Sequence, residues 1–338
     1  MKTVVRDEYG GPEVLKLRQA SAPTIGAGEV LIDVMAASLN AADIHLLRGT
    51  PLPARLAFGL RRPKRAAMGA DVAGRVAAVG SGVSEFQVGD RVFGDLSGAG
   101  FGAFAQQVAA PASALTRMPD KVDYAEAAAS GMAAVTALQA VRGKRGTQAP
   151  ESGDHVLVTG ASGGVGSFAV QIAKAYGAHV TAVTGTENVE AVLALGADQV
   201  IDRRTTDFRA GTGAAYDLIV EAGGYGSVRA VLRLLKRGGR YVFVGGGDGE
   251  TMTALLLGKS FLATPSQADL REVAQLLQAG SVVPLKGARF GLEQAADAFR
   301  LLESGSVTGK IVFDVGASVV QSVGGAARSE VAISSSAA

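Results

Sequence analysis

The sequence predicts an α/β protein in which a β-rich first third is followed by a doubly wound parallel sheet. Residues 1–120 contain short apolar runs divided by glycine- and proline-rich turns, which is typical of a small β-domain. From about residue 124 onward, strand-like and helix-like segments alternate, as they do in sheets built from βαβ units. A glycine-rich turn at residues 160–166 joins one such strand to a helix. The 338 residues suffice for about two domains.

Four apolar or alternating runs define the expected strands of the β-rich part. They lie at residues 15–17, 30–35, 72–79 and 91–93. The turns between them lie at residues 10–12, 26–28, 81–82 and 89–90. Short strands at this spacing predict a small barrel-like domain.

The glycine-rich turn has the pattern of a dinucleotide-binding site. It follows a buried strand at residues 155–159, and it precedes a helix at 167–176 and a second strand at 180–184. In this context backbone N–H groups approach a pyrophosphate closely, and the positive helix N-terminus faces its charge. An incidental glycine turn is the weaker interpretation, because strand and helix flank it. The predicted cofactor contacts are Ala161, Ser162, Gly163, Gly164, Val165 and Gly166.

The second half continues the alternation of strands and helices. Strands are expected at residues 217–220, 240–244 and 310–313, and helices at 227–235, 267–278 and 292–302. The alanine-rich run at 125–141 is interrupted by Glu126, Ser130 and Gln139, and it predicts a core helix rather than a membrane span. From residue 317 the chain is rich in serine, glycine and alanine, which predicts a flexible tail.

Composition limits the possible partners. With 48% hydrophobic and 19% charged residues and a net charge of +2, the chain is typical of a globular protein, and neither nucleic acid nor a membrane is expected. The absence of cysteine excludes disulfides and thiolate metal ligands. The first six residues lack the apolar core of a signal peptide, so a cytoplasmic location is expected.

Several motifs in order along the chain resemble the medium-chain dehydrogenase/reductase superfamily, in its zinc-free quinone oxidoreductase-like branch. They lie at residues 38–43, 68–74, 79–83, 88–92, 160–166, 195–198 and 309–312. The resemblance implies a GroES-like β-barrel catalytic domain from residues 1–122 and 284–316. It implies a Rossmann NADPH-binding domain from residues 123–283, a tail from 317 and an active site between the domains. A monomer or a homodimer is expected.

The resemblance also indicates what is missing. Zinc-dependent relatives place a cysteine where this chain has Asn40, a His-Glu pair where it has Ala70 and Asp71, and a cysteine where it has Met132. These residues cannot form a zinc cage, so no bound zinc is expected. Without a metal to stabilise an alkoxide, acceptors that delocalise charge are favoured.

The expected activity is therefore hydride transfer from NADPH to a quinone or an α,β-unsaturated carbonyl. Two alternatives remain open. An enoyl-thioester reductase shares this architecture, and a non-enzymatic nicotinamide sensor or partner protein could keep the fold.

NADPH is predicted over NADH from the end of the second strand. NAD sites usually hold a carboxylate about 20 residues beyond the glycines, and that point falls at Gly185, next to Thr184, where no carboxylate stands. Glu187, two residues further on, is the counter-argument. The resemblance implies that Arg203 contacts the 2′-phosphate, with a solvated loop as the alternative.

The resemblance assigns further residues to the active site. Cofactor contacts are implied for Ala222, Val244, Gly245, Gly246 and Lys310. Asn40 is expected to face the substrate, and Thr136 to lie near the nicotinamide or to have its hydroxyl satisfied within a helix. His45 is a candidate proton donor, with water as the alternative, whereas Asp43 is expected to cap the backbone.

Two surface segments complete the expectations. Residues 248–264 are shorter than in relatives, and 260–263 is interpreted as the remnant of an edge strand that often pairs across a dimer. The basic run at residues 61–65 is expected to be a solvated loop, or a basic rim that attracts the anionic cofactor.

Overall fold

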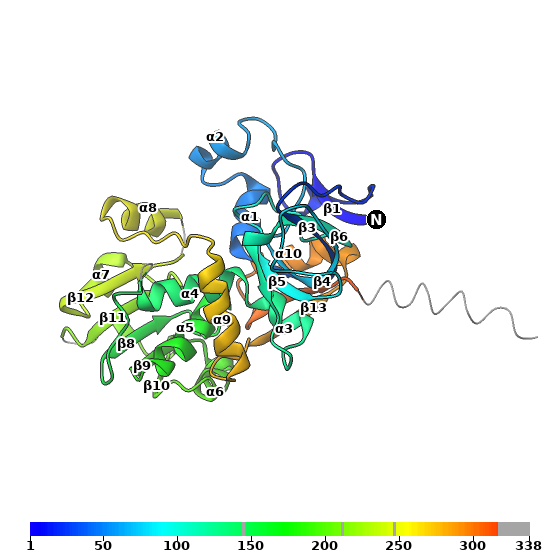
Figure 1. Cartoon of the computed structure of the whole chain (residues 1–338). Coiled ribbons are helices and arrows are strands. Elements are labelled where there is room, and N and C mark those ends of the chain that lie inside the picture. Colours follow the sequence, from blue (N-terminus) through cyan, green and yellow to red (C-terminus); the bar gives the residue numbers. More distant parts are fainter. Residues whose placement is uncertain (144–145, 211–212, 246–247, 317–338) are drawn as a thin grey trace, which may run out of the picture.

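The computed structural model describes residues 1–143, 146–210, 213–245 and 248–316. Gly246 and the segment predicted as a flexible tail lie outside the described residues. Figure 1 shows two parts that lie side by side, each with its own sheet. None of the helices in the described part is both long and apolar enough to cross a bilayer.

The first part is built on a seven-stranded sheet, with a separate hairpin of β1 (Lys2–Arg6) and β2 (Leu15–Gln19). The large sheet has the order β13, β14, β3, β4, β5, β7, and β6 pairs with β3. The strands are β3 (Glu29–Leu39), β4 (Asp71–Val79), β5 (Arg91–Asp95), β6 (Gln107–Pro111), β7 (Leu115–Arg117), β13 (Lys286–Phe290) and β14 (Lys310–Asp314). All four strands expected from the apolar runs are present.

The end of the described chain returns to this first sheet. Strand β14 pairs antiparallel with β3, and Phe313 lies opposite Ala37. The ring of Phe313 packs edge-on against Phe104, with centroids 4.7 Å apart, and Phe104 also meets Phe299. Phe299 lies on α10 (Ala295–Glu303), so three distant segments share one aromatic core. The helices α1 (Ala41–Arg48) and α2 (Arg55–Phe58) connect β3 to β4.

The second part is a five-stranded, wholly parallel sheet in the order β10, β9, β8, β11, β12. Its strands are β8 (His155–Thr159), β9 (His179–Thr184), β10 (Gln199–Asp202), β11 (Tyr216–Glu221) and β12 (Leu235–Phe243). The order reverses between β8 and β11, and open α/β sheets bind their ligands at such a switch point. The expected doubly wound sheet is therefore present.

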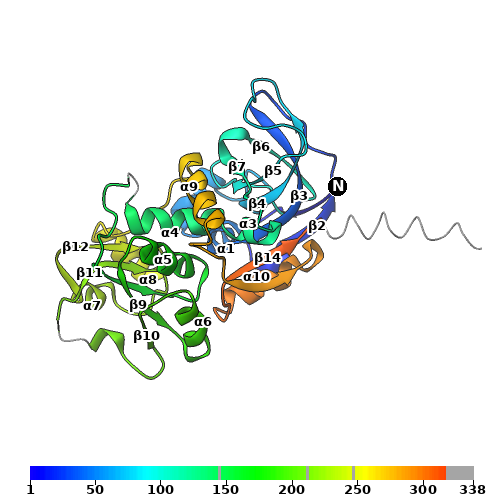
Figure 2. The ribbon, with the colours of Figure 1, turned by 60° about the horizontal axis from the view of Figure 1, so that its bottom comes forward.

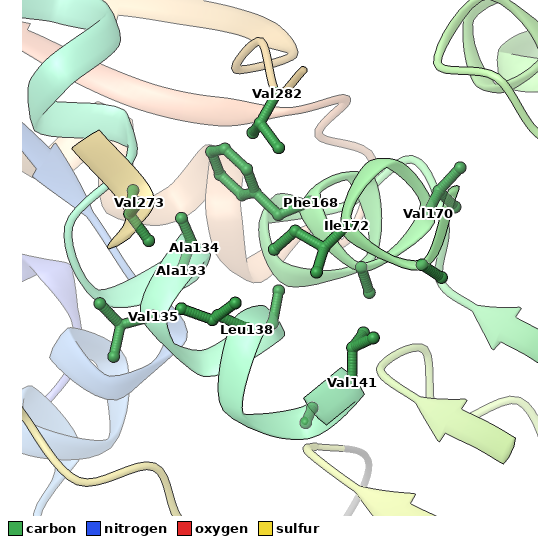
Figure 3. Close-up of a cluster of buried hydrophobic side chains, with 14 of the residues drawn as sticks. Ala133, Ala134, Val135, Leu138, Val141, Phe168, Val170, Ile172, Val273 and Val282 are labelled. Atoms are coloured by element: carbon green, nitrogen blue, oxygen red, sulfur yellow. The ribbon is translucent and has the colours of Figure 1, made fainter. Parts of the chain in front are cut away.

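Helices cover the faces of this sheet and connect it to the first part. They are α3 (Tyr124–Ala129), α4 (Met132–Arg142), α5 (Gly164–Ala175), α6 (Val189–Ala194), α7 (Val228–Leu232), α8 (Asp248–Leu256) and α9 (Gln267–Gln278). Figure 2 shows α4, α5 and α9 together between the two sheets. In Figure 3, Leu138 of α4 faces Phe168 and Ile172 of α5, and small alanines of α4 let the helices approach closely.

Several elements differ from the expected ranges. The core helix expected over residues 125–141 is divided into α3 and α4. The helix expected at 227–235 ends at Leu232, and β12 already begins at Leu235, with its pairing to β11 shifted between Tyr216 and Leu218. The helix expected at 292–302 begins with a 3₁₀ turn before α10. Of the strand remnant expected at 260–263, Ser260 forms one parallel bridge with Phe243, and the N–H of Phe261 donates to the carbonyl oxygen of Phe243 at 2.9 Å.

The predicted domain limits at residues 122 and 284 stay a prediction. The strands of the parallel sheet all lie between residues 155 and 243, and those of the other two sheets lie outside this range.

Candidate active site

The turn between β8 and α5 is shaped so that only glycine fits at its two ends. Gly160 has a φ of +63°, and a Cβ there would lie 2.7 Å from the Cα of Gly223. A Cβ on Gly166 would lie 2.1 Å from the carbonyl oxygen of Gly160. The first turn of helix α5 therefore packs directly against the end of strand β8. Gly163 is the N-cap of the helix and Gly164 is its first residue. The first-turn N–H groups of α5 have no partner within the helix, and a helix N-terminus of this kind is suited to bind a phosphate.

The chain segment before β14 lies directly on this turn. The N–H of Gly309 donates to the carbonyl oxygen of Ser162 at 2.7 Å, and Gly309 forms a parallel bridge with Gly163. The stem of Lys310 covers Gly164, where an added Cβ would lie 2.9 Å from Cδ of the lysine. The first and second parts of the protein thus meet at the glycine turn.

The ammonium group of Lys310 continues past the turn into a buried polar cluster. Its Nζ donates to the carbonyl oxygen of Leu39 at 3.0 Å and to Oδ1 of Asn40, and it lies 3.4 Å from Oδ2 of Asp71. The Nδ2 of Asn40 donates to Oδ2 of Asp71 at 2.9 Å. The N–H of Met132, at the start of α4, donates to Oδ1 of Asp71 at 2.7 Å. Asp71 and Lys310 are almost completely buried, so this ion pair is shielded from water.

Three of these residues stand at positions that the resemblance assigns to zinc ligands in zinc-dependent relatives. Asn40 and Met132, far apart in the sequence, both donate hydrogen bonds to the carboxylate of Asp71. Their donor set does not suit zinc, because it offers an amide, one carboxylate and a backbone N–H, with an ammonium cation beside them. Across the described ranges, no group of three or more His, Cys, Asp or Glu side chains is arranged to hold a metal ion.

Two further buried carboxyl groups surround the cluster. Oδ2 of Asp43 accepts a hydrogen bond from the N–H of Asn40 at 2.9 Å, so Asp43 caps α1 as expected, while its Oδ1 is buried without a partner. Burial, with repulsion from Asp71, raises the pKa of Asp43 to about 7. Burial and the same repulsion raise the pKa of Asp95 to about 6. Burial also raises the pKa of Asp71, and the Lys310 ammonium opposes this.

The candidate proton donor and the candidate threonine lie on different elements. His45 is exposed on α1, and its Nδ1 lies 3.1 Å from the hydroxyl oxygen of Thr50. Thr136 is buried on α4, one turn beyond Met132 and on the same helix face. Asn40 is also buried, and both ends of its amide are engaged in the cluster. The structure therefore places Asn40 in the buried cluster and Thr136 one helical turn beyond Met132, and it leaves His45 at the surface.

The expected nicotinamide contacts follow neighbouring strand ends. The N–H of Ala222 donates to the carbonyl oxygen of Thr159 at 3.3 Å, and the N–H of Val244 donates to the backbone carbonyl oxygen of Glu221 at 2.9 Å. Gly245 follows directly. Sequence reasoning missed Glu221, whose Oε1 accepts a hydrogen bond from the Thr159 hydroxyl at 2.7 Å and whose Oε2 is buried without a partner. Burial raises the pKa of Glu221. A carboxylate as the last residue of a buried strand was the available signal.

The ends of β9 and β10 form a basic corner. Thr184 is fully buried, and its hydroxyl lies 2.9 Å from that of Ser162. The N–H of Arg203 donates to the carbonyl oxygen of Thr184 at 2.9 Å, and its guanidinium lies 4.4 Å from the ring centroid of Tyr225. A pocket of about 500 Å³ opens there, lined by residues that include Arg203, Arg204, Arg209 and Tyr225.

Glu187, the counter-argument to a 2′-phosphate, is paired at this corner. Its Oε1 accepts a hydrogen bond from Arg204 at 3.0 Å, and its side chain is 53% exposed. The carboxylate of Glu187 lies close to Gly185, because a Cβ added to Gly185 would be 2.9 Å from Oε1 of Glu187. Arg204 thus offsets the charge of Glu187, and Arg203 forms no ion pair with any residue that the structure places.

Comparison with known proteins gives two family matches and many similar full-length chains. The "Alcohol dehydrogenase GroES-like domain" family matches residues 26–120, and the "Zinc-binding dehydrogenase" family matches residues 195–313. The chloroplast envelope quinone oxidoreductase homolog of Arabidopsis thaliana is 33% identical over 93% of this chain and 98% of its own length. The NADPH-dependent alkenal/one oxidoreductase of the Arabidopsis thaliana chloroplast is 32% identical, over 92% of this chain and 79% of its own length.

A solved structure agrees with these sequence matches. The quinone oxidoreductase of Coxiella burnetii superposes with a TM-score of 0.81 at 29% identity, covering 93% of this chain and 99% of its own. The expected combination of a GroES-like domain with a Rossmann-type parallel sheet is therefore confirmed. The chain belongs to the medium-chain dehydrogenase/reductase superfamily, in its quinone oxidoreductase-like branch.

Proposed function

We propose that the protein is a zinc-independent oxidoreductase that uses NADPH to reduce a quinone or an α,β-unsaturated carbonyl. The observation that supports the zinc independence is the Lys310–Asp71–Asn40 cluster, in which an ammonium cation lies beside two of the residues that the resemblance aligns with zinc ligands. The relatives named for quinones and for alkenals support the reaction and the acceptor class. NADPH, when bound, supplies the hydride.

The residues present fit a dinucleotide. The glycine turn offers first-turn N–H groups of α5 for the pyrophosphate, and a side chain at position 166 would close the gap to Gly160. Arg203 and the basic corner suit a 2′-phosphate, because Glu187 is already paired with Arg204. These features support NADPH over NADH as the proposed cofactor.

The acceptor class follows from what the site can stabilise. The ammonium of Lys310 has three acceptors around it, so it fixes Asn40 and Asp71 and is not free to bind a substrate oxygen. An acceptor that spreads incoming charge over a conjugated system needs less electrostatic stabilisation than a simple ketone. Protonation of the product by His45 or by water completes the proposed reaction.

A spectrophotometric assay with metal analysis tests this proposal. NADPH oxidation at 340 nm is expected with quinones and enones, unchanged by a chelator, together with less than stoichiometric zinc. Stoichiometric zinc, or activity that a chelator removes, would contradict the zinc independence. NADPH binding without oxidation by any acceptor would favour a sensor.

The assembly and the compartment remain predictions. The edge of β12 carries one bridge from Ser260, so we propose a monomer or a homodimer, which light scattering distinguishes. The proposed location is the cytoplasm.

A further inference from the structure

Residues 50–65, between α1 and β4, carry exposed apolar and basic side chains together. The exposed apolar side chains, between 41% and 75% accessible, are Leu52, Leu56, Phe58 and Leu60. Figure 1 shows this segment around α2, projecting from the first part of the protein. Large apolar side chains grouped outside the core mark contact surfaces.

The charge of this region is one-sided. From residue 44 to residue 70 the chain has no acidic residue, whereas six of its 33 basic residues lie there. Arg61, Arg62 and Lys64 are exposed, and none of them forms an ion pair within the described part of the chain. Because the rest of the chain has more acids than bases, the net charge of +2 conceals this basic segment.

Hydrogen bonds and a cation–π contact anchor the backbone of residues 50–65 to the first part of the protein, while its apolar side chains stay exposed. The hydroxyl of Tyr9 donates to the carbonyl oxygen of Gly59 at 2.7 Å. Arg55 lies over the Tyr9 ring, 4.4 Å from its centroid, and donates from Nε to the carbonyl oxygen of Gly49 at 2.9 Å. Within the segment, the N–H of Lys64 donates to the carbonyl oxygen of Phe58 at 2.7 Å. These contacts order the backbone while leaving the leucines exposed.

We propose that residues 50–65 dock the protein onto an anionic lipid surface. Leu52, Leu56 and Leu60 would enter the boundary between headgroups and acyl chains, and the basic run would contact lipid phosphates. Either signal alone binds weakly, and stable attachment takes two. The contact is interfacial, and it revises the expectation of no membrane partner, which rested on the overall charge.

Vesicle flotation of the full chain tests this proposal without cofactor or acceptor, so its outcome is independent of the proposed reaction. The protein is mixed with vesicles of phosphatidylcholine alone or with added phosphatidylglycerol, at low and high salt. We expect flotation with the anionic vesicles, at least about tenfold less with neutral ones, and weakening by salt. Absence of flotation with anionic vesicles at low salt would overturn the proposal.

Matched variants locate the contact. The charge variant R61A/R62A/K64A is compared with K121A/R233A/R237A, which removes three exposed cations elsewhere. The apolar variant L52S/L56S is compared with L255S/L256S, whose leucines on α8 are 60% and 80% exposed. We expect only the two variants in residues 50–65 to lose flotation, with unchanged melting temperatures. Equal losses in the matched variants would show a non-specific effect and overturn the proposal.

Other occupants of this surface give different results. A site for a soluble polyanion would bind heparin with an affinity that L52S/L56S does not change. A contact between two copies of the chain would appear as a dimer that L52S/L56S dissociates. Either result, without vesicle binding that depends on the leucines, would overturn lipid docking.

Discussion

The Nζ atom of Lys310 lies 3.4 Å from Oδ2 of Asp71, although 239 residues separate the two in the chain. The stem of Lys310 covers Gly164 at the glycine turn, and its ammonium group ends among residues of the first sheet. One side chain therefore couples the proposed phosphate cradle to the buried cluster of Asn40 and Asp71. Its removal should affect both stability and the reaction.

We expect Lys310→Met to destabilise the fold by roughly 3–5 kcal/mol, because it leaves Asp71 buried without its cation. Thermal unfolding measures the loss. The double variant Lys310→Met/Asp71→Leu should recover part of it, since no unpaired charge remains. A single variant as stable as the wild type would show that the ion pair contributes little.

The pH dependence of stability should report the buried Asp43. Its pKa is about 7 in the folded protein against an ordinary value of 3.8. Between these values the folded protein holds more protons than the unfolded chain, so stability falls as pH rises. From pH 5 to 7 the contribution is roughly 2 kcal/mol.

Asp43→Asn keeps an acceptor for the Asn40 N–H and removes this titration. We expect its unfolding free energy to fall less steeply between pH 5 and 7 than that of the wild type, with a remaining slope from Asp95, whose pKa is also raised. Chemical denaturation at several pH values measures the difference. Parallel curves for the two proteins would contradict the assignment.

Cofactor preference should depend on Arg203. Loss of one charged contact to a phosphate typically removes about 1.5–3 kcal/mol, so Arg203→Ala should raise the KM for NADPH by roughly tenfold or more. The KM for NADH should stay unchanged. Arg204→Ala tests the same corner in a second way. It removes the ion-pair partner of Glu187, whose carboxylate near Gly185 should then repel a 2′-phosphate and raise the KM for NADPH. If the KM for NADPH is unchanged in Arg203→Ala, Arg203 does not contact the 2′-phosphate, and the alternative interpretation of a solvated loop holds.

The short distance between Gly166 and Gly160 predicts that no side chain larger than a hydrogen atom fits at position 166. In Gly166→Ala the new Cβ would meet the carbonyl oxygen of Gly160 at 2.1 Å, and moving α5 away costs about 1–3 kcal/mol. We expect a lower melting temperature and weaker NADPH binding by calorimetry. Gly213→Ala is the control, because no atom lies within 4 Å of its added Cβ. Equal behaviour of the two variants would show that the turn is not tightly packed.

The sequence predicted well those features that depend on neighbours in the chain. Strand β8 and helix α9 have the predicted ranges, because periodic apolar residues and a capping residue such as Ser266 act locally. The glycine turn follows the same logic. The partners of Lys310 could not be predicted, since they depend on how β14 is placed against β3 and α4. The family resemblance singled out Asn40, Asp71 and Met132, but it did not predict the ammonium group of Lys310 beside Asn40.

Either His45 or water donates the proton to the reduced product, and a variant at position 45 distinguishes the two. The imidazole is exposed, and its Nδ1 lies 3.1 Å from the hydroxyl oxygen of Thr50. If His45 donates the proton, His45→Phe should lower kcat by about 10²–10⁴-fold with an unchanged NADPH KM. Thr50→Val, which removes the partner hydroxyl but keeps the ring, should lower it far less. A kcat for His45→Phe within a few fold of the wild type would assign the proton to water.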